Sequence, residues 1–177
     1  MAQLSLIILV CVILLIYSIS TLIIFKTQKS LSATYYLLNT VKKGLGGLFV
    51  ITMLLSTLIT TPIWITISDY INPNFTPIVF IAIFSMIMVG ITPTYKDDDM
   101  DSNLHNIFAI IGVIAGILWI FLSCIDIIYV PLTFILIPII AMIILKGWKY
   151  SMVFWLEIIA FFAIYSTLIV KTLDIYL

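Results

Sequence analysis

Six long apolar runs leave this chain little choice of fold. They cover about residues 4–25, 45–67, 76–92, 104–124, 127–145 and 150–170. A helix needs about 20 residues to cross the hydrocarbon core of a bilayer, and a segment in lipid must satisfy its own backbone hydrogen bonds. The runs lack the apolar and polar alternation of a half-buried strand. The sequence therefore predicts an all-α, polytopic membrane bundle of six transmembrane helices, in one domain over residues 1–177.

The composition agrees with a membrane location and excludes one class of partner. Hydrophobic residues make up 64% of the 177 residues and charged residues 9%, whereas soluble domains are about half apolar and a quarter charged. All of the basic residues are lysines, so the chain lacks the guanidinium fork that reads bases and phosphates in nucleic acids. We expect membrane lipids as partners and no nucleic acid.

The lysines are concentrated in alternate connectors between the predicted helices. Only Lys171 lies on the other side of the stack, and the connectors after the first, third and fifth helices hold Lys26, Lys29, Lys42, Lys43, Lys96, Lys146 and Lys149. Cytoplasmic connectors of membrane proteins carry an excess of lysine and arginine. We therefore expect these three connectors to face the cytoplasm in an inner (plasma) membrane, with both termini outside.

The first of these connectors mixes apolar and hydroxyl residues between two pairs of lysines. Its sequence predicts a short interfacial helix near residues 30–41, with Ser30 or Ser32 as the N-terminal cap and Tyr35 at the level of the lipid headgroups. A loop with interfacial tyrosines is the alternative.

An acidic run precedes the fourth predicted helix. Asp97, Asp99 and Asp101 have the spacing of the first half of a calcium loop. An EF-hand, however, requires glycine at its sixth position and glutamate at its twelfth, where this chain has Ser102 and Phe108. A looser cation site at the three aspartates remains one hypothesis. Stabilisation of the helix N-terminus by nearby acids is the favoured one.

Two ionisable side chains lie within the predicted spans. Glu157 is about 10 Å into the sixth helix at 1.5 Å per residue, where an ionisable group costs about 2.5–3.5 kcal/mol and needs a partner or a proton. His105, the only histidine, lies in the first turn of the fourth helix. Because Ser32 and Tyr35 also lie on the predicted cytoplasmic half, these four residues form the candidate polar site.

Small and hydroxyl residues mark the predicted helix contacts. Ser56 and Thr60 share one side of the second helix and are candidate partners for Glu157. Gly112 and Gly116 have the spacing at which two helices approach closely, either within the bundle or at a dimer face. One histidine and two separated cysteines do not provide a usual metal or haem ligand set, so we expect no cofactor and no metal.

Three short segments resemble known membrane proteins. They are S-L-S-A-T-Y-Y-L-L at 30–38, G-x-x-P at 90–93 and H-N-x-x-A at 105–109. With them the chain resembles a group of small polytopic membrane proteins of gut Bacteroidetes and of their phages, and more loosely it is similar to a bacterial and archaeal domain-of-unknown-function membrane family. The resemblance implies a six-helix inner-membrane protein whose pattern includes Ser32, Tyr35, Pro93 and His105. It implies no activity.

Three classes of function stay open. The sequence contains none of the phosphate-binding, nucleophile-elbow or zinc-protease patterns, which favours binding of a lipid or of a membrane-protein partner without catalysis. A proton- or cation-coupled transporter or channel subunit using Glu157 is the second class, for which a homo-oligomer would supply enough helices. An intramembrane enzyme acting on lipids, with His105 beside one of the aspartates, is the third.

Overall fold

The computed structural model describes residues 2–26, 28–92, 99–146, 149 and 151–176, and their secondary structure is entirely helical. This confirms the predicted all-α class. The elements are α1 (Ala2–Phe25), α2 (Thr34–Val41), α3 (Gly47–Ile71), the 3-10 turn η1 (Pro73–Phe75), α4 (Thr76–Ile91), α5 (Asp99–Ser123), the 3-10 turn η2 (Ile125–Ile127), α6 (Tyr129–Ile144) and α8 (Met152–Tyr176).

Five helical segments are long and apolar enough to cross a membrane. They are Ala2–Phe25, Gly47–Ile71, Pro73–Ile91, Asn103–Ser123 and Met152–Ile175. The sixth predicted span, 127–145, contains the shorter apolar helix α6 of 16 residues. At 1.5 Å per residue α6 is about 24 Å long, against a hydrocarbon core of about 30 Å. The chain thus forms a membrane-type bundle in which α6 is the short member.

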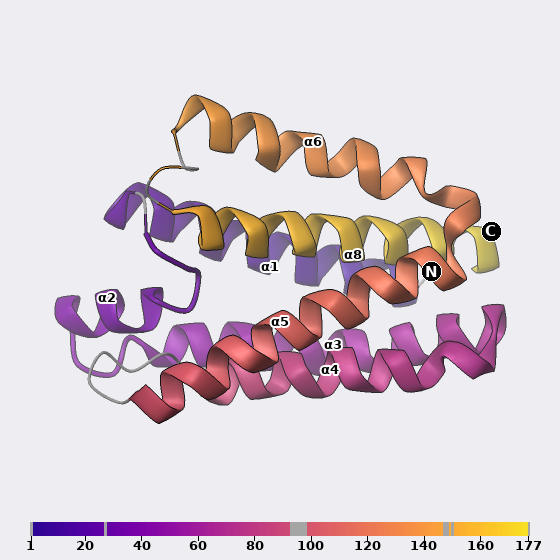
Figure 1. Ribbon diagram of the computed structural model, residues 1–177, viewed down its shortest axis with the longest axis horizontal. Coiled ribbons are helices and arrows are strands. Elements are labelled where there is room, and N and C mark those ends of the chain that lie inside the picture. The colour runs from indigo at the N-terminus through magenta and orange to yellow at the C-terminus, as the bar shows by residue number, and fades with distance from the viewer. Residues whose placement is uncertain (1, 27, 93–98, 147–148, 150, 177) are drawn as a thin grey trace.

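The long helices lie side by side along one axis (Figure 1). α4 packs between α3 and α5, and α8 contacts α1, α3, α5 and α6. α6 packs chiefly on α8 and lies at the outside of the bundle. Because α8 contacts four other helices, it borders both of the internal spaces described below.

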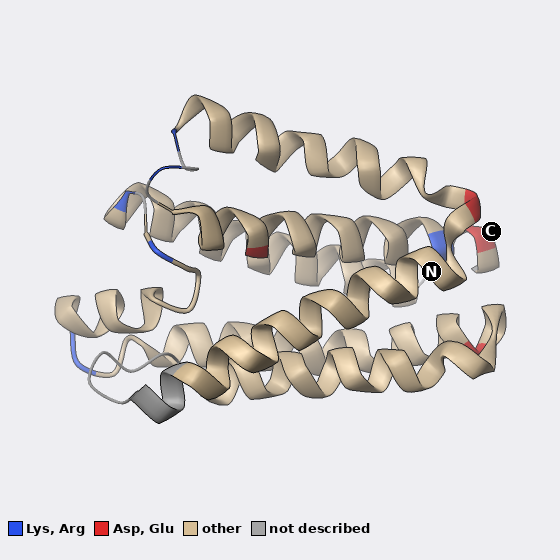
Figure 2. Ribbon diagram, in the orientation of Figure 1, with Lys and Arg blue, Asp and Glu red and all other residues tan. Residues whose placement is uncertain are grey.

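The charges of the described residues separate between the two ends of the bundle (Figure 2). The connectors that flank α2 and the one that follows α6 bring lysines to one end. The opposite end, where both chain ends lie, carries aspartates and Lys171. Lys96 lies outside the described residues. The lysines of the described residues therefore gather at one end, as the alternation of the connectors predicts. We call this the basic end, and the end with Asp69, Asp126 and Asp174 the acidic end; the side chains of the acidic run 97–101 lie outside the described residues.

An ion pair closes the acidic end. The Lys171 ammonium of α8 lies 2.5 Å from Asp126 Oδ2 in η2 and 3.7 Å from Asp174 Oδ2. The hydrogen bond from Lys171 lowers the pKa of the Asp126 carboxyl below its ordinary value. Asp126 is largely exposed and Lys171 is buried. The ion pair therefore provides a partner for the buried ammonium group near the C-terminal end of α8.

Indole packing holds α3, α4 and α5 together nearer the same end. Trp64 and Trp119 meet edge to face, with ring centroids 5.5 Å apart. The indole N–H of Trp119 donates to the Ser68 hydroxyl at 3.0 Å, and Thr76 donates to Asp69 at 2.5 Å. These bonds satisfy polar groups that would otherwise be costly in an apolar interior.

The glycine pair of α5 is used inside the bundle. A Cβ added at Gly112 would lie 3.1 Å from Ser85 Cβ of α4, and one at Gly116 would lie 2.6 Å from Ile164 Cδ1 of α8. Both glycines therefore allow neighbouring helices of the same chain to approach α5 closely, which is the first of the two readings of their spacing.

A tight turn attaches α2 to the start of α3. The Asn39 side-chain oxygen accepts hydrogen bonds from the main-chain N–H groups of Gly44 and Gly46, at 2.9 and 3.0 Å. Gly44 has a φ of +95°, a left-handed conformation that favours glycine. A Cβ at Gly46 would lie 2.5 Å from the Tyr35 carbonyl oxygen, whereas a Cβ at Gly47 would meet nothing within 4 Å.

These two neighbouring glycines give a matched test of the turn. We expect Gly46→Ala to lower the free energy of unfolding by about 1–3 kcal/mol, because its methyl group must push α2 away from α3. Gly47→Ala, in open space at the first residue of α3, should leave stability unchanged or raise it slightly. Thermal unfolding of the purified protein, followed by circular dichroism, measures both. Equal midpoints for the two variants would contradict the close approach at Gly46.

Candidate functional site

The partner of the buried carboxylate is a main-chain group from a distant part of the chain. Glu157 lies in the second turn of α8, and its Oε2 accepts a hydrogen bond from the Leu31 N–H at 2.6 Å. The hydroxyls of Thr57, Thr60 and Thr61, on the helix expected to supply a partner, instead bond to carbonyls one turn earlier in α3. Glu157 thus joins α8 to the connector between α1 and α2.

A second hydrogen bond fastens the same connector to α8. The Phe154 N–H, near the start of α8, donates to the Lys29 carbonyl at 3.2 Å. The first N–H groups of a helix have no partner within the helix, so Lys29 satisfies one of them. Gln28 and Leu31 are buried. The segment 28–34, called the folded connector below, is therefore folded in between helices rather than spread over the surface.

Hydroxyl groups fix the shape of the folded connector. Thr34 donates to the Leu31 carbonyl at 2.6 Å, and its hydroxyl also bonds to that of Tyr17 on α1. The Ser30 hydroxyl accepts the Ala33 N–H at 3.1 Å, just before α2 begins. The N-cap position of α2 is Ala33, which makes no side-chain cap hydrogen bond, so the prediction of Ser30 or Ser32 as the cap is wrong. Ser30 instead fixes the turn that leads into the helix.

Glu157 and Ser32 border the same small cavity. It has a volume of about 60 Å³, and the rest of its lining comes mainly from apolar side chains of α3, α4, α5 and α8, including Phe49, Phe108 and Phe161. A space of this size has room for a few water molecules. The structure thus brings together two of the four predicted site residues, in a cavity where a carboxylate faces an otherwise apolar wall.

His105 does not line that cavity. It is 2% exposed, and its Nδ1 lies 2.7 Å from the Thr92 carbonyl oxygen at the end of α4. Because a carbonyl only accepts, Nδ1 carries the proton and donates it. His105 therefore ties the start of α5 to the end of α4.

The other predicted site residues fall elsewhere. Tyr35 lies in α2, where its ring meets Tyr36 edge to face at 5.7 Å. Asp97 lies outside the described residues, and so do the side chains of Asp99 and Asp101. In the part of the chain that the structure describes, no three His, Cys, Asp or Glu side chains are grouped as a metal site would need.

A larger space, which sequence reasoning missed, runs between α1, α6 and α8. Its volume is about 410 Å³ and its lining is almost entirely apolar, with Leu14, Leu22, Ile137, Ala141 and Phe162 among the residues around it. α8 forms its floor and the other two helices form its walls, since α6 packs on α8 but has little contact with α1. We call this space the α1–α6–α8 groove.

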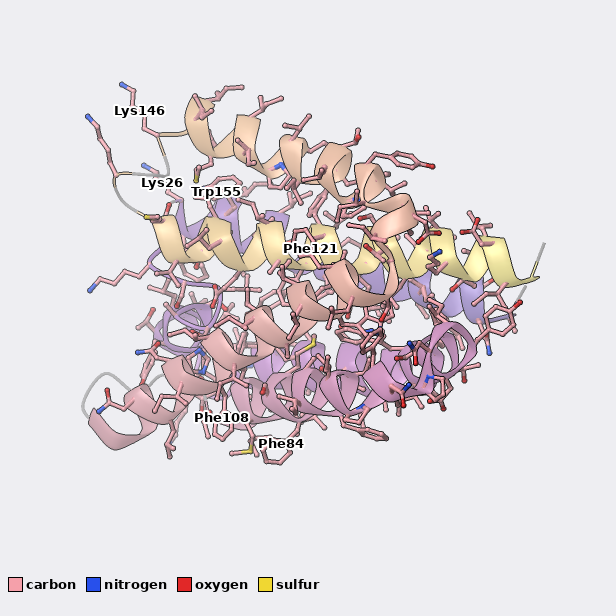
Figure 3. The ribbon with its side chains drawn as sticks, turned by 45° about the vertical axis from the view of Figure 1, so that its right-hand side comes forward. Lys26, Phe84, Phe108, Phe121, Lys146 and Trp155 are labelled. Atoms are coloured by element: carbon pink, nitrogen blue, oxygen red, sulfur yellow. The ribbon has the colours of Figure 1, made fainter. Side chains whose placement is uncertain are left out.

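Lysines lie where the walls of the groove end. α1 is followed by Lys26 and α6 by Lys146, and both residues have left-handed backbone angles, with φ of 59° and 53°. Figure 3 shows the two lysines at the same end of the molecule, with Trp155 of α8 close by. Trp155 lines the groove, is 4% exposed, and its indole N–H has no hydrogen-bond partner among the described residues.

Comparisons of the chain with protein-family models, with curated proteins and with solved structures find no match. The chemistry open to the protein is therefore inferred from the two spaces on either side of α8. One is a small cavity with a carboxylate, and the other is a long apolar groove with a basic end.

Replacing Glu157 tests whether it holds the folded connector in place. We expect Glu157→Leu to speed hydrogen exchange of the Leu31 amide by roughly tenfold, because a hydrogen bond to a charged or buried polar group contributes about 1.5 kcal/mol. Glu157→Gln keeps an oxygen acceptor and should exchange nearly as slowly as the unmodified protein. Hydrogen–deuterium exchange with mass spectrometry resolves peptides covering 28–34. Unchanged exchange in Glu157→Leu would show that the bond contributes nothing to the connector.

Proposed function

We propose that this protein is a small membrane protein that binds a lipid acyl chain in the α1–α6–α8 groove, without catalysis of its own. The observation that carries the proposal is the groove itself. Its 410 Å³ falls in the range of about 300–1,000 Å³ typical of ligand sites. A nearly unbroken apolar lining suits a hydrocarbon chain and offers little to a polar ligand.

The placement in the membrane is part of the proposal. The excess of lysines in the connectors at one end supports an inner (plasma) membrane orientation with the basic end in the cytoplasm and both termini outside. α6 then forms a sixth span. The bilayer thins locally around this short helix, and the Lys146 side chain extends to the interface. α2, at the basic end, lies along the interface with Val41 toward the lipid, since that side chain is 63% exposed.

The state of His105 supports binding over lipid hydrolysis. Its Nδ1 is engaged with the Thr92 carbonyl and the ring is buried, whereas a general base must reach the proton that it removes. His105 has the geometry of a residue that connects two helix ends. An enzyme using it would need α4 and α5 to separate.

Coupled transport is the second candidate, and Glu157 is the observation that favours it. A carboxylate beside a 60 Å³ cavity within the bundle can carry a proton or hold a small cation. A homo-oligomer would supply the helices that a carrier needs. In proteoliposomes with an internal pH dye, Glu157→Gln should abolish any proton-coupled flux. A flux that is equal in the variant and the unmodified protein would rule out this role for Glu157.

Filling the groove tests the proposed lipid binding. Ala141 of α6 lines the groove, and its neighbour Ile140 is 54% exposed and is not part of the lining. We expect Ala141→Phe to reduce the lipid retained after detergent-free extraction by about tenfold, because the ring takes space that the chain occupies. Ile140→Phe adds a ring on the outer face and should retain lipid normally. Native mass spectrometry counts the bound lipid.

Two results would contradict the proposal. The first is an unmodified protein that carries no lipid through extraction. The second is an equal amount of lipid on the Ala141→Phe and Ile140→Phe variants, since that would place the lipid on the outside of the bundle.

A further inference from the structure

Three lysines on different elements follow or bond to residues that line one end of the groove, namely Leu22, Leu145 and Phe154. Lys26 follows α1, Lys146 follows α6, and Lys29 belongs to the folded connector, which is bonded to the first turns of α8. All three side chains are exposed, and none forms an ion pair with a carboxylate of the described residues. We call this end of the groove, with Lys26, Lys29 and Lys146, its basic mouth.

Among the side chains that the structure describes, no acidic group lies at this mouth. Asp69, Asp126 and Asp174 belong to the opposite end of the bundle. Glu157, on α8, has its Oε2 engaged by the Leu31 N–H and borders the small cavity rather than the groove. No carboxyl group among the described side chains therefore competes with a ligand for these three lysines.

Helix ends alone do not account for this arrangement. A cation is favoured at any helix C-terminus, which is reason enough for one lysine after α1 and one after α6. The left-handed position that ends a helix usually holds glycine, however, and both helices have lysine there. The helix dipole also gives no reason for Lys29, which lies in a connector, to join the other two at the same mouth.

Two buried polar groups near the lysines lack partners. The indole N–H of Trp155, in the groove lining, has none among the described residues, and neither amide atom of Gln28 has one. Gln28 is 5% exposed and lies between two of the lysines in the chain. Buried polar groups are nearly always hydrogen-bonded. Ester and phosphate oxygens are acceptors that would suit both N–H donors.

We propose that the groove binds one anionic phospholipid, with an acyl chain between α1, α6 and α8 and its phosphate at Lys26, Lys29 and Lys146. This inference rests on the proposed function, because it names the class of lipid that the groove holds. A net-negative headgroup neutralises the three ammonium groups. A zwitterionic headgroup brings its own ammonium into the same mouth and is bound less tightly.

Titration of the full chain with two headgroups tests the selectivity. The protein is extracted, stripped of lipid, and titrated with phosphatidylglycerol or phosphatidylcholine of identical acyl chains, with bound lipid counted by native mass spectrometry. Each lysine near an anionic lipid contributes about fivefold in affinity. We expect a preference of at least about tenfold for phosphatidylglycerol, which weakens as salt is raised.

Two lysine-to-glutamine variants locate the preference. The triple variant Lys26→Gln, Lys29→Gln, Lys146→Gln should still bind both lipids, at the lower affinity of phosphatidylcholine. The control Lys42→Gln, Lys43→Gln removes charges from the turn between α2 and α3, at the same end of the bundle but away from the groove. It should keep the full preference. Circular dichroism confirms that both variants fold, as expected for exposed side chains.

The outcomes separate this inference from the proposed function. Equal affinity of the unmodified protein for the two lipids overturns the inference and leaves acyl-chain binding standing. Loss of the preference in the Lys42 and Lys43 control to the same extent as in the triple variant also overturns it, since any surface charge would then serve. Failure to bind either lipid removes the proposed function itself.

Discussion

The hydrogen bond between the Leu31 N–H and Glu157 is the contact on which the arrangement at the basic end depends. A carboxylate inside a membrane helix is costly unless it is partnered, and a main-chain N–H buried away from water is costly for the same reason. Each group removes the cost of the other. The bond also decides where the chain runs after α1, because the folded connector must reach α8 to make it. The positions of Lys29 and of α2 follow from that path.

α8 gives the molecule two different interiors. One side of this helix presents Glu157 and Ala160 to the small cavity, and another presents Ile158 and Phe162 to the groove, with Phe161 bordering both. The cavity that holds the carboxyl group and the apolar groove can lie so close together because successive side chains of a helix point in directions about 100° apart. A ligand in the groove would therefore rest on the same helix that holds the folded connector.

The sequence was informative about the site only where the signal was local. Glu157 was recognisable because an acid in an apolar run needs a partner. The cap of α2 was predicted wrongly, since the N-cap position is Ala33 rather than Ser30 or Ser32. The actual partner of Glu157 was not predictable, since any main-chain N–H can serve and Leu31 is 126 residues away. The link between His105 and Thr92 was hidden for the same reason. The basic mouth could not be predicted from the sequence, because Lys26, Lys29 and Lys146 come to the same end of the groove only in the folded chain.

The apolar runs by themselves determined an all-helical membrane bundle, because a chain in lipid has to satisfy its backbone within each segment. The spacing of lysines determined that they would gather at one end, because successive helices reverse direction. Only the tertiary structure decided that α6 packs against α8 and that a groove remains between α6 and α1. Hydrophobicity marks which side chains avoid water but, on a helix that is apolar on every side, not which neighbour covers them.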